Sequence, residues 1–171
     1  LLDDVNANLY YARSEASESK AADDSYRSRL EYRGDRYGAV YERLFVGANF
    51  NPEVGYVRRT DMLRDFGQAR FSPRMRRGPV RQITWQGTLD YVTSPSHDRV
   101  ENREAKGEFQ MEFHSSDELD LEYVHDYELL PSNFTIASGV VVPKGSYTYQ
   151  SAKAQFIFGH QRPVSGTLGL R

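Results

Sequence analysis

Four carboxylates lie close together in the second half of the sequence, at Glu108, Glu112, Asp120 and Glu122. Two carboxylates held about 5–10 Å apart are what glycoside hydrolysis requires, with one acting as acid and the other as nucleophile or base. However, any acidic hairpin brings carboxylates to such distances, and the chain holds 24 acidic residues. We therefore assign no catalytic residue from the sequence and keep a glycan-cleaving hydrolase as the weaker alternative.

Metal and cofactor chemistry receive no support from the spacing of residues. The histidines His97, His114, His125 and His160 are scattered and do not show the spacing of metal ligands on one element. The chain has no cysteine, which excludes a disulfide framework and a thiolate metal site. No nucleophile-elbow, phosphate-loop or dinucleotide-binding signature occurs between a strand and a helix. No cofactor and no metal are expected.

The composition narrows the class of protein. The 171 residues suffice for one domain, and a net charge of −2 gives no electrostatic reason to expect nucleic acid as a partner. Hydrophobic content is 39%, while tyrosine and phenylalanine are frequent, at 12 and 9 residues. No run approaches 18 apolar residues, so we expect no transmembrane helix, which says nothing against a membrane-spanning β-barrel.

Alternation with period two dominates the chain and predicts strands. The exception is "RRTDMLRDFG", where Thr60 or Asp61 is expected to cap one or two helical turns that end near Gly67. The resulting fold class is all-β, an antiparallel up-and-down meander of about nine strands. We expect residues 1–171 to be a single β-barrel segment of a longer protein, incomplete at both ends.

Two tight turns set an expected register. A two-residue turn at Gly34-Asp35 closes the first hairpin, and a three-residue turn at 115–117 keeps apolar side chains opposite one another in a later one. The second register sets two acidic side chains opposite each other, which requires water or a cation nearby. The expected pairs are Tyr32 with Tyr37, Phe113 with Leu119, and Glu112 with Asp120.

The connections between the predicted strands alternate in length. In an up-and-down sheet, alternate connections lie at opposite ends, so the long loops gather at one end and the tight turns at the other. This asymmetry is typical of outer-membrane β-barrels. The longer connections are 13–24, 47–67, 94–98 and 131–145, and the short ones are 34–35, 77–79, 115–117 and 160–162.

In such a barrel the apolar face of each strand contacts lipid and the charged face lines the lumen. The arginines come from early strands and the carboxylates from later ones, so a transverse field that favours polar or zwitterionic solutes is one hypothesis. Ordinary salt bridging is the other. Arg43, Glu101 and Arg103 fall on the apolar face and fit only near a headgroup level. The lumen-lining candidates are Arg27, Arg29, Arg70, Arg74, Glu108, Glu112, Asp120 and Glu122. The lipid-facing candidates are Tyr32, Tyr37, Trp85, Phe109, Phe113, Leu121 and Tyr123.

The longest loop carries "NFNPEVGYVRR", rich in turn-forming Asn, Pro and Gly. Its loop or gate candidates are Asn51, Glu53, Arg58 and Arg59, with the two arginines held by lumenal acids. One interpretation is a gate or a glycan contact, and the other is an ordered loop that caps the end of the sheet. We favour the ordered loop.

Several separated motifs carry a resemblance to a known family. "NFNPEVGYVRRTD", "FGQARFSPR", "RVENREAKGEFQMEF", "YELLPSNFTIASGVVVPKGSY" and "GHQRPVSGTLGLR" span nearly the whole chain. They resemble the C-terminal β-rich domain of unknown function from bacterial proteins that carry an N-terminal family-9-like carbohydrate-binding domain. The resemblance implies a longer polypeptide exported in a Gram-negative bacterium. It brings no catalytic residues, and the sugar-binding part lies outside this chain.

Together these observations predict a segment of an outer-membrane β-barrel protein, not an enzyme, that serves solute passage, docking or glycan-related surface binding. The expected partners are outer-membrane lipid, a glycan or other small polar solute, and other membrane or periplasmic proteins. The alternative is a soluble β-rich carbohydrate-binding module, with Trp85 and exposed tyrosines as stacking platforms for sugar rings. A barrel distributes its aromatic side chains as a belt, whereas a binding module concentrates them in one patch.

Overall fold

The structure is a computed structural model that describes residues 4–14, 23–52, 56–57, 59–161 and 163–171. Nine strands form one antiparallel sheet, which confirms the expected all-β meander. The strands of this sheet are β1 (Val5–Ser14), β2 (Asp23–Arg33), β3 (Tyr37–Val46), β4 (Met62–Phe71), β5 (Val80–Ser94), β6 (Arg99–Phe113), β7 (Glu118–Leu130), β10 (Gly145–Phe158) and β11 (Gly166–Leu170).

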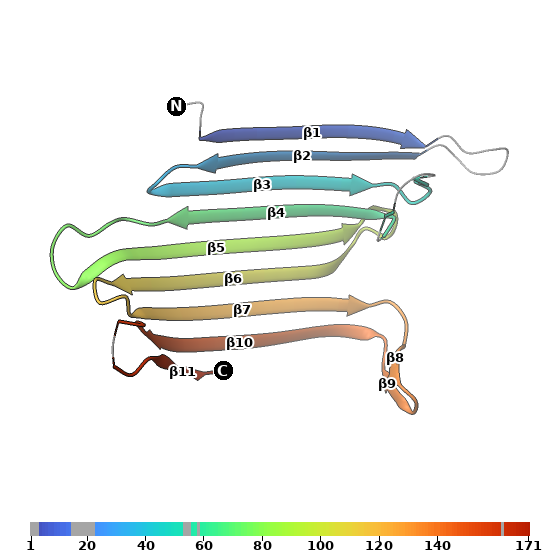
Figure 1. Cartoon of the computed structure of the whole chain (residues 1–171). Coiled ribbons are helices and arrows are strands. Elements are labelled where there is room, and N and C mark those ends of the chain that lie inside the picture. Colours follow the sequence, from blue (N-terminus) through green and yellow to red (C-terminus); the bar gives the residue numbers. More distant parts are fainter. Residues whose placement is uncertain (1–3, 15–22, 53–55, 58, 162) are drawn as a thin grey trace.

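Each inner strand pairs with its two neighbours in chain order, except that β7 pairs with β10 across the intervening hairpin. Alternate connections therefore lie at opposite ends of the sheet, and β1 and β11 lie at its two edges (Figure 1). Because β1 pairs only with β2, and β11 only with β10, the sheet is open over the residues that the structure describes.

The connection between β7 and β10 holds a short hairpin of its own. β8 (Phe134–Ala137) pairs with β9 (Val140–Val142), and this hairpin projects from the end of the main sheet (Figure 1). Between β5 and β6 the chain forms one 3-10 turn, η1 (Pro95–His97). No helix in the described part of the chain is long and apolar enough to cross a membrane.

The short helix expected after Thr60 or Asp61 is wrong, because β4 begins directly after Asp61. β4 pairs with β3 along its whole length and with β5 over Leu63–Phe71. Local helix propensity is a weak preference that such pairing overrides. Asp61 itself has a left-handed φ of 54°, and there the chain turns into the strand.

The register expected for the first hairpin is wrong by two residues, although the alternation of faces is right. Tyr32 pairs with Ala39 rather than with Tyr37. The turn is wider than two residues, and its Gly34 carbonyl accepts a hydrogen bond from Arg70 of β4 at 2.6 Å. This contact with a strand distant in the sequence stabilises the wider turn.

The register expected for the β6–β7 hairpin is also wrong by two residues. Leu119 pairs with Met111 rather than with Phe113. The turn includes Asp117, which is 3% exposed. Its carboxylate accepts a hydrogen bond from the backbone N–H of Gly159 at 2.9 Å, which joins this turn to the one between β10 and β11. The contact between the two turns holds the wider turn in place.

Like charges do lie opposite each other in this hairpin, but with a different partner. Glu112 pairs with Glu118 rather than with Asp120. The cation that such a pair requires comes from Arg81 of β5, whose Nε lies 3.1 Å from Glu112 Oε2.

Strict alternation of long and short connections is wrong. The connection 72–79 is longer than 95–98, although 95–98 lies at the end with the longest loops. β4 ends at Phe71, earlier than expected, and Arg74 beyond it makes only an isolated bridge to Gln82. The two ends still differ, since connections 47–61 and 131–144 lie at the same end (Figure 1).

The main sheet is a single layer, and neither face is covered by another layer (Figure 1). Among the described residues, Val46 is the one hydrophobic side chain that is buried. Many large hydrophobic side chains are exposed, among them Leu30, Trp85 and Leu89. The sheet therefore has no hydrophobic core of its own. Its buried polar residues are Ser25, Glu31, Glu42, Ser72, Ser94, Glu101 and Asp117.

Candidate functional site

The polar face of β2 to β4 is organised around Glu42. The Glu42 carboxylate accepts hydrogen bonds from Arg27 at 2.5 Å and Arg29 at 3.1 Å, and Arg64 Nη1 lies 3.4 Å away. Alternation places the two β2 arginines, Glu42 of β3 and Arg64 of β4 on one face. Only 7% of the Glu42 side chain is exposed, so the guanidinium groups take the place of its water.

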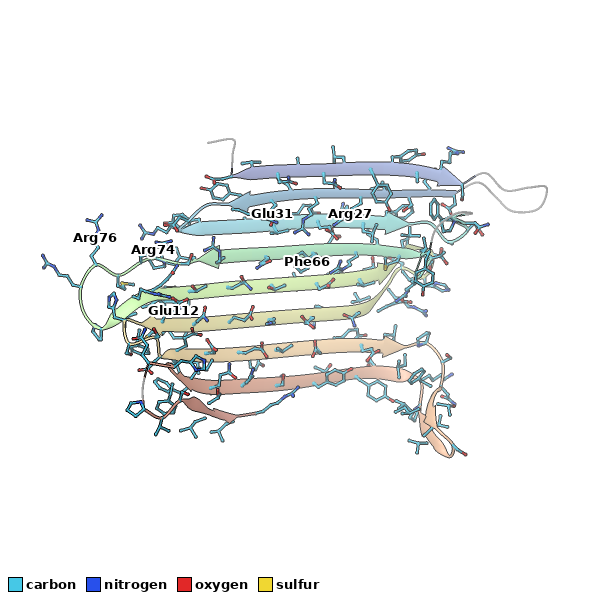
Figure 2. The ribbon with its side chains drawn as sticks, viewed as in Figure 1. Arg27, Glu31, Phe66, Arg74, Arg76 and Glu112 are labelled. Atoms are coloured by element: carbon cyan, nitrogen blue, oxygen red, sulfur yellow. The ribbon has the colours of Figure 1, made fainter. Side chains whose placement is uncertain are left out.

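The same network extends to both sides of Glu42. Glu31, which shares this face with Arg27 (Figure 2), accepts a hydrogen bond from Arg33 Nε at 2.6 Å. On the other side Arg64 reaches Asp90 of β5 at 2.6 Å. The early strands, from which the sequence predicted an excess of arginine, thus contain carboxylates of their own. The charges of the predicted lumen-lining residue Arg27 and its neighbours are paired.

Arg70 and Arg74, two further lumen-lining candidates, contact the turn between β2 and β3. Arg70 donates hydrogen bonds to the backbone carbonyls of Gly34 and Asp35. Arg74 lies beyond the end of β4, together with Arg76 (Figure 2), and pairs with the Asp35 carboxylate at 2.7 Å. Its side chain is 68% exposed. Both arginines therefore support the turn end of the sheet.

The polar face of β5, β6, β7 and β10 is richer in carboxylates. Lys106 lies between Glu108 and Glu122, at 2.9 and 3.2 Å from their carboxylate oxygens. Gln155 of β10 donates a hydrogen bond to Asp120 at 2.9 Å. These strands bring three of the predicted lumen-lining carboxylates together in one group.

A polar cavity of about 310 Å³ lies over this group. The cavity is open to the same side as the Glu42 network, because its polar lining comes from the charged face of each strand. Glu112, the remaining carboxylate candidate, lies outside it. The residues that line the cavity are Thr84, Gln86, Glu108, Phe109, Gln110, Asp120, Leu121, Glu122, Lys153 and Gln155.

The arrangement offers little to glycoside hydrolysis. That reaction requires one carboxyl group to be protonated while the other is charged. Glu108 and Glu122 both pair with the ammonium group of Lys106, so their surroundings do not distinguish an acid from a base. Within the described residues no group of three or more His, Cys, Asp or Glu side chains is placed to hold a metal ion. The cavity is better suited to binding than to cleavage.

The opposite face carries an aromatic row across β3 to β6. Tyr37, Phe71, Trp85 and Phe109 are successive partners in the register, with ring centroids 5.2, 5.7 and 5.5 Å apart. All seven lipid-facing candidates lie on this face. Besides Tyr37, Trp85 and Phe109, these candidates are Tyr32, Phe113, Leu121 and Tyr123.

A second aromatic group lies on the same face, toward the end with the long loops. Tyr26 and Phe45 stack there with centroids 5.2 Å apart. Phe45 is eight residues beyond Tyr37 on β3, which corresponds to about 27 Å at about 3.4 Å per residue. Next to the first aromatic row lies a hollow of about 850 Å³, whose base is lined by small residues such as Ala69 and Gly87.

The charged residues expected on the apolar face each have a charged or aromatic partner. Arg43 pairs with Asp65 through two hydrogen bonds, at 2.7 and 2.9 Å. Arg103 lies over the Tyr127 ring, 5.8 Å from its centroid. Glu101 lies in a β-bulge without a register partner on β5 and pairs with Arg99 at 3.1 Å. These charges are at the loop end of the strands.

The first half of the longest connection, 47–61, is tied to the strands below it. Asp23 accepts a hydrogen bond from the backbone N–H of Asn49 at 2.7 Å, and Ser14 accepts one from that of Asn51 at 3.1 Å. A Cβ on Gly47 would overlap the Asp23 carboxylate, so a larger residue there would require the Asp23 side chain to move. Asn51 therefore lies where the loop is anchored to β1.

The second half of this connection is tied to the 3-10 turn. Asp61 accepts hydrogen bonds from the Ser94 hydroxyl and from the backbone N–H of Ser96, and lies 3.3 Å from His97 Nδ1. Partial burial opposes the charged carboxylate, but the hydrogen bonds from Ser94, Ser96 and His97 outweigh it and lower the pKa of Asp61 to about 2.

This cluster does not form a Ser-His-Asp triad. Ser94 and Asp61 both contact the same ring nitrogen of His97, whereas a triad uses the two nitrogens separately. Ser94 is also 1% exposed. Its role is to hold the loop. Sequence reasoning missed the cluster because Asp61 and Ser94 lie far apart in the chain.

Arg59 is the other loop candidate with a defined contact, an ion pair with Glu101 on β6. Glu53 and Arg58 lie outside the described residues. The contacts of Asn51 and Arg59 agree with an ordered loop at the end of the sheet, and the gate remains a hypothesis.

Comparisons of this chain with family models, with curated proteins and with solved structures found no match.

Proposed function

We propose that this chain is part of a β-barrel that spans the outer membrane of a Gram-negative bacterium and serves passage, docking or surface binding of a polar solute. The observation that carries the proposal is the contrast between the two faces of one uncovered sheet. One face exposes aromatic and aliphatic side chains such as Trp85 and Leu89. The other holds hydrogen-bonded charges around Glu42.

The dimensions of the apolar face support a bilayer as its surroundings. Strands of a membrane barrel tilt by about 40°, so rows about 27 Å apart along a strand are about 21 Å apart along the membrane normal. This is close to the apolar band of about 25 Å that aromatic girdles flank in such barrels. The strands β1 to β7 and β10 have 10 to 15 residues, which suffices because spanning requires about 9–11, whereas β11 has five described residues in the sheet.

The charged residues on the apolar face have partners that lower their cost in a bilayer. Arg43 and Asp65 neutralise each other, and Arg103 stacks on Tyr127, at the loop end of the strands. Charged side chains cost little at the depth of the lipid headgroups and about 2–4 kcal/mol at the bilayer midplane. A bilayer centred between Tyr37 and Phe45 places Arg43 two residues from the midplane, about 5 Å along the membrane normal, so pairing with Asp65, rather than a headgroup level, must offset the cost of this charge.

The glycan-related part of the proposal rests on the resemblance to bacterial proteins with an N-terminal family-9-like carbohydrate-binding domain. That resemblance stays a prediction. In this proposal the two domains share one function. The carbohydrate-binding domain binds glycans outside the barrel, and the barrel passes or retains a sugar. Other membrane or periplasmic proteins remain proposed partners.

A soluble carbohydrate-binding module is the second candidate. It is favoured by the exposed ring of Trp85. However, sugar rings stack on free aromatic faces, and the Trp85 ring is stacked on Phe71 at an angle of 18°. The aromatic side chains also form rows across several strands instead of one patch, which favours the barrel.

Fractionation followed by conductance measurement tests the proposal. The full-length protein is expected in the outer-membrane fraction, and the purified protein should produce stepwise conductance in a planar lipid bilayer. Recovery in the soluble fraction would exclude the membrane proposal. Recovery in the outer membrane without conductance would exclude passage and leave docking.

A further inference from the structure

The polar cavity over β5, β6, β7 and β10 is built from two adjacent cross-strand rows. The strands are about 4.8 Å apart and the two rows are two residues apart along each strand, so the rows cover an area of about 14 by 7 Å. The register thus places eight polar side chains as a continuous floor. One row is Thr84, Gln110, Asp120 and Gln155, and the other is Gln86, Glu108, Glu122 and Lys153.

Within each row, amide groups donate hydrogen bonds to neighbouring carboxylates. Gln86 donates to Glu108 at 2.8 Å, and Gln155 donates to Asp120 at 2.9 Å. Each contact occupies an N–H of the amide and leaves its carbonyl oxygen available. Both glutamines line the cavity, so they add acceptors to its floor.

Acceptors outnumber donors on the floor of the cavity. A carboxylate offers about four lone-pair positions. Hydrogen bonds and ion pairs with described residues engage Asp120 through Oδ2 and Glu122 through Oε2, so the second oxygen of each has no partner among the described residues. Donors come from the Lys153 ammonium group and the Thr84 hydroxyl. The lining therefore matches a solute that carries many hydroxyl groups, which donate and accept at once.

The charge of the group is nearly balanced. Glu108, Asp120 and Glu122 face the two ammonium groups of Lys106 and Lys153, which leaves one net negative charge. A cationic solute would have to compete with Lys106 for the carboxylates that it already bridges. An uncharged polyhydroxylated solute displaces no ion pair.

We propose that this cavity binds a compact, uncharged, polyhydroxylated solute of about the size of a hexose. A volume of about 310 Å³ lies at the lower end of small-molecule sites, roughly 300–1,000 Å³. The inference deepens the proposed function, since it names the class of solute and the residues that hold it. It rests on the barrel only for access, because the site itself is formed by four adjacent strands.

Binding of D-glucose to the full-length protein in detergent micelles, followed by saturation-transfer NMR, tests the inference. Asp120→Ala combined with Gln155→Ala removes two neighbouring members of one row. This variant should weaken glucose binding at least tenfold. The matched control is Gln68→Ala, a glutamine on the same face of β4 that lies outside the cavity. The control should bind glucose like the unchanged protein.

Three results would overturn the inference: no glucose binding, equal binding by the double variant, or tighter binding of ethanolamine, a small cation, than of glucose. A gel-mobility shift on heating, recorded on every sample, reports the folded barrel separately. Absence of glucose binding with the shift present rejects the sugar site alone. Absence of the shift with glucose bound rejects the barrel alone.

Discussion

The two faces of the sheet treat exposed side chains in opposite ways. On the polar face, charges are hydrogen-bonded to one another, and the Glu42 carboxylate retains only 7% of its exposure. On the apolar face, Leu89 remains 47% exposed and Trp85 43%, although both project from the middle strands of the sheet. Alternate residues of one strand thus have opposite surroundings.

This difference indicates what each face requires from outside. The polar face pairs many of its charges internally, around Glu42 and Lys106, and tolerates water. The apolar face has no partner in the described residues, and large exposed apolar patches mark surfaces that contact protein or membrane. A bilayer on one side and water on the other meet both needs.

The largest expected effect comes from Glu42→Ala, which tests whether the polar face depends on internal pairing. The variant leaves Arg27, Arg29 and Arg64 without their shared carboxylate. Breaking a buried pair costs about 3–5 kcal/mol, and we expect the lower end because the arginines are about one-third exposed. Urea unfolding of the full-length protein, followed by tryptophan fluorescence, measures the loss.

The matched control is Glu104→Ala on β6, since Glu104 lies on the same face without an ion-pair partner among the described residues. Its free energy of unfolding should change by less than about 0.5 kcal/mol. Equal losses in the two variants would show that the Glu42 network is not what stabilises this face.

The second prediction compares neighbouring residues of β5 that point to opposite faces. Leu89→Arg places a charge on the apolar face, and Thr88→Arg places it on the polar face. In a membrane barrel the first should cost about 2–3 kcal/mol and the second close to nothing. Folding yield in lipid vesicles and urea unfolding measure both. If water covered both faces, Leu89→Arg would be tolerated as well as Thr88→Arg, and the membrane proposal would fail.

Features that depend on neighbouring residues could be predicted from the sequence, whereas features that depend on contacts between distant residues could not. Period-two alternation is local, so it correctly assigned Tyr37, Trp85 and Phe109 to one face. The register depends on contacts between distant residues, such as Arg70 with the Gly34 carbonyl, and was wrong by two positions. The helix predicted at Asp61 failed for the same reason, because the pairing of β4 is not visible locally.

The candidate site was predictable only in part. The lumen-lining carboxylates Glu108, Asp120 and Glu122 do come together, because alternation within a hairpin is local. Their neighbour Gln155 was missed, since it comes from β10 across a long connection. The pairing of Arg64 with Asp90 was missed likewise, because it joins strands whose register the sequence did not give.

The third prediction concerns the loop end, where polar contacts hold a connection in place. Asp61→Asn weakens the contacts to Ser94 and Ser96 and should cost about 1–2 kcal/mol. Because the folded-state pKa of Asp61 is lowered to about 2, its contribution is complete above about pH 4 and is lost as the pH falls through 2.

Unfolding of the unchanged protein and the variant between pH 6 and pH 2 measures this. The difference in free energy should be constant at the higher pH values and should shrink toward pH 2. A difference that grows on acidification would contradict the assigned role of the Asp61 carboxylate.

The smallest effect is expected for Arg74→Ala at the turn end. Arg74 and Asp35 form an ion pair with side chains 68% and 71% exposed, and such surface pairs contribute about 0–1 kcal/mol. Thermal unfolding at low and high salt measures it. A loss comparable to that of Glu42→Ala would mean that the turn end, rather than the polar face, stabilises the sheet.

The most direct test of a membrane-spanning barrel is the gel migration of the full-length protein, extracted from membranes in mild detergent, before and after boiling. Closed barrels have no free strand edges and resist detergent, so the unboiled protein should migrate faster and shift on boiling. A single band with the same mobility before and after boiling, from protein recovered in the soluble fraction, would contradict the barrel.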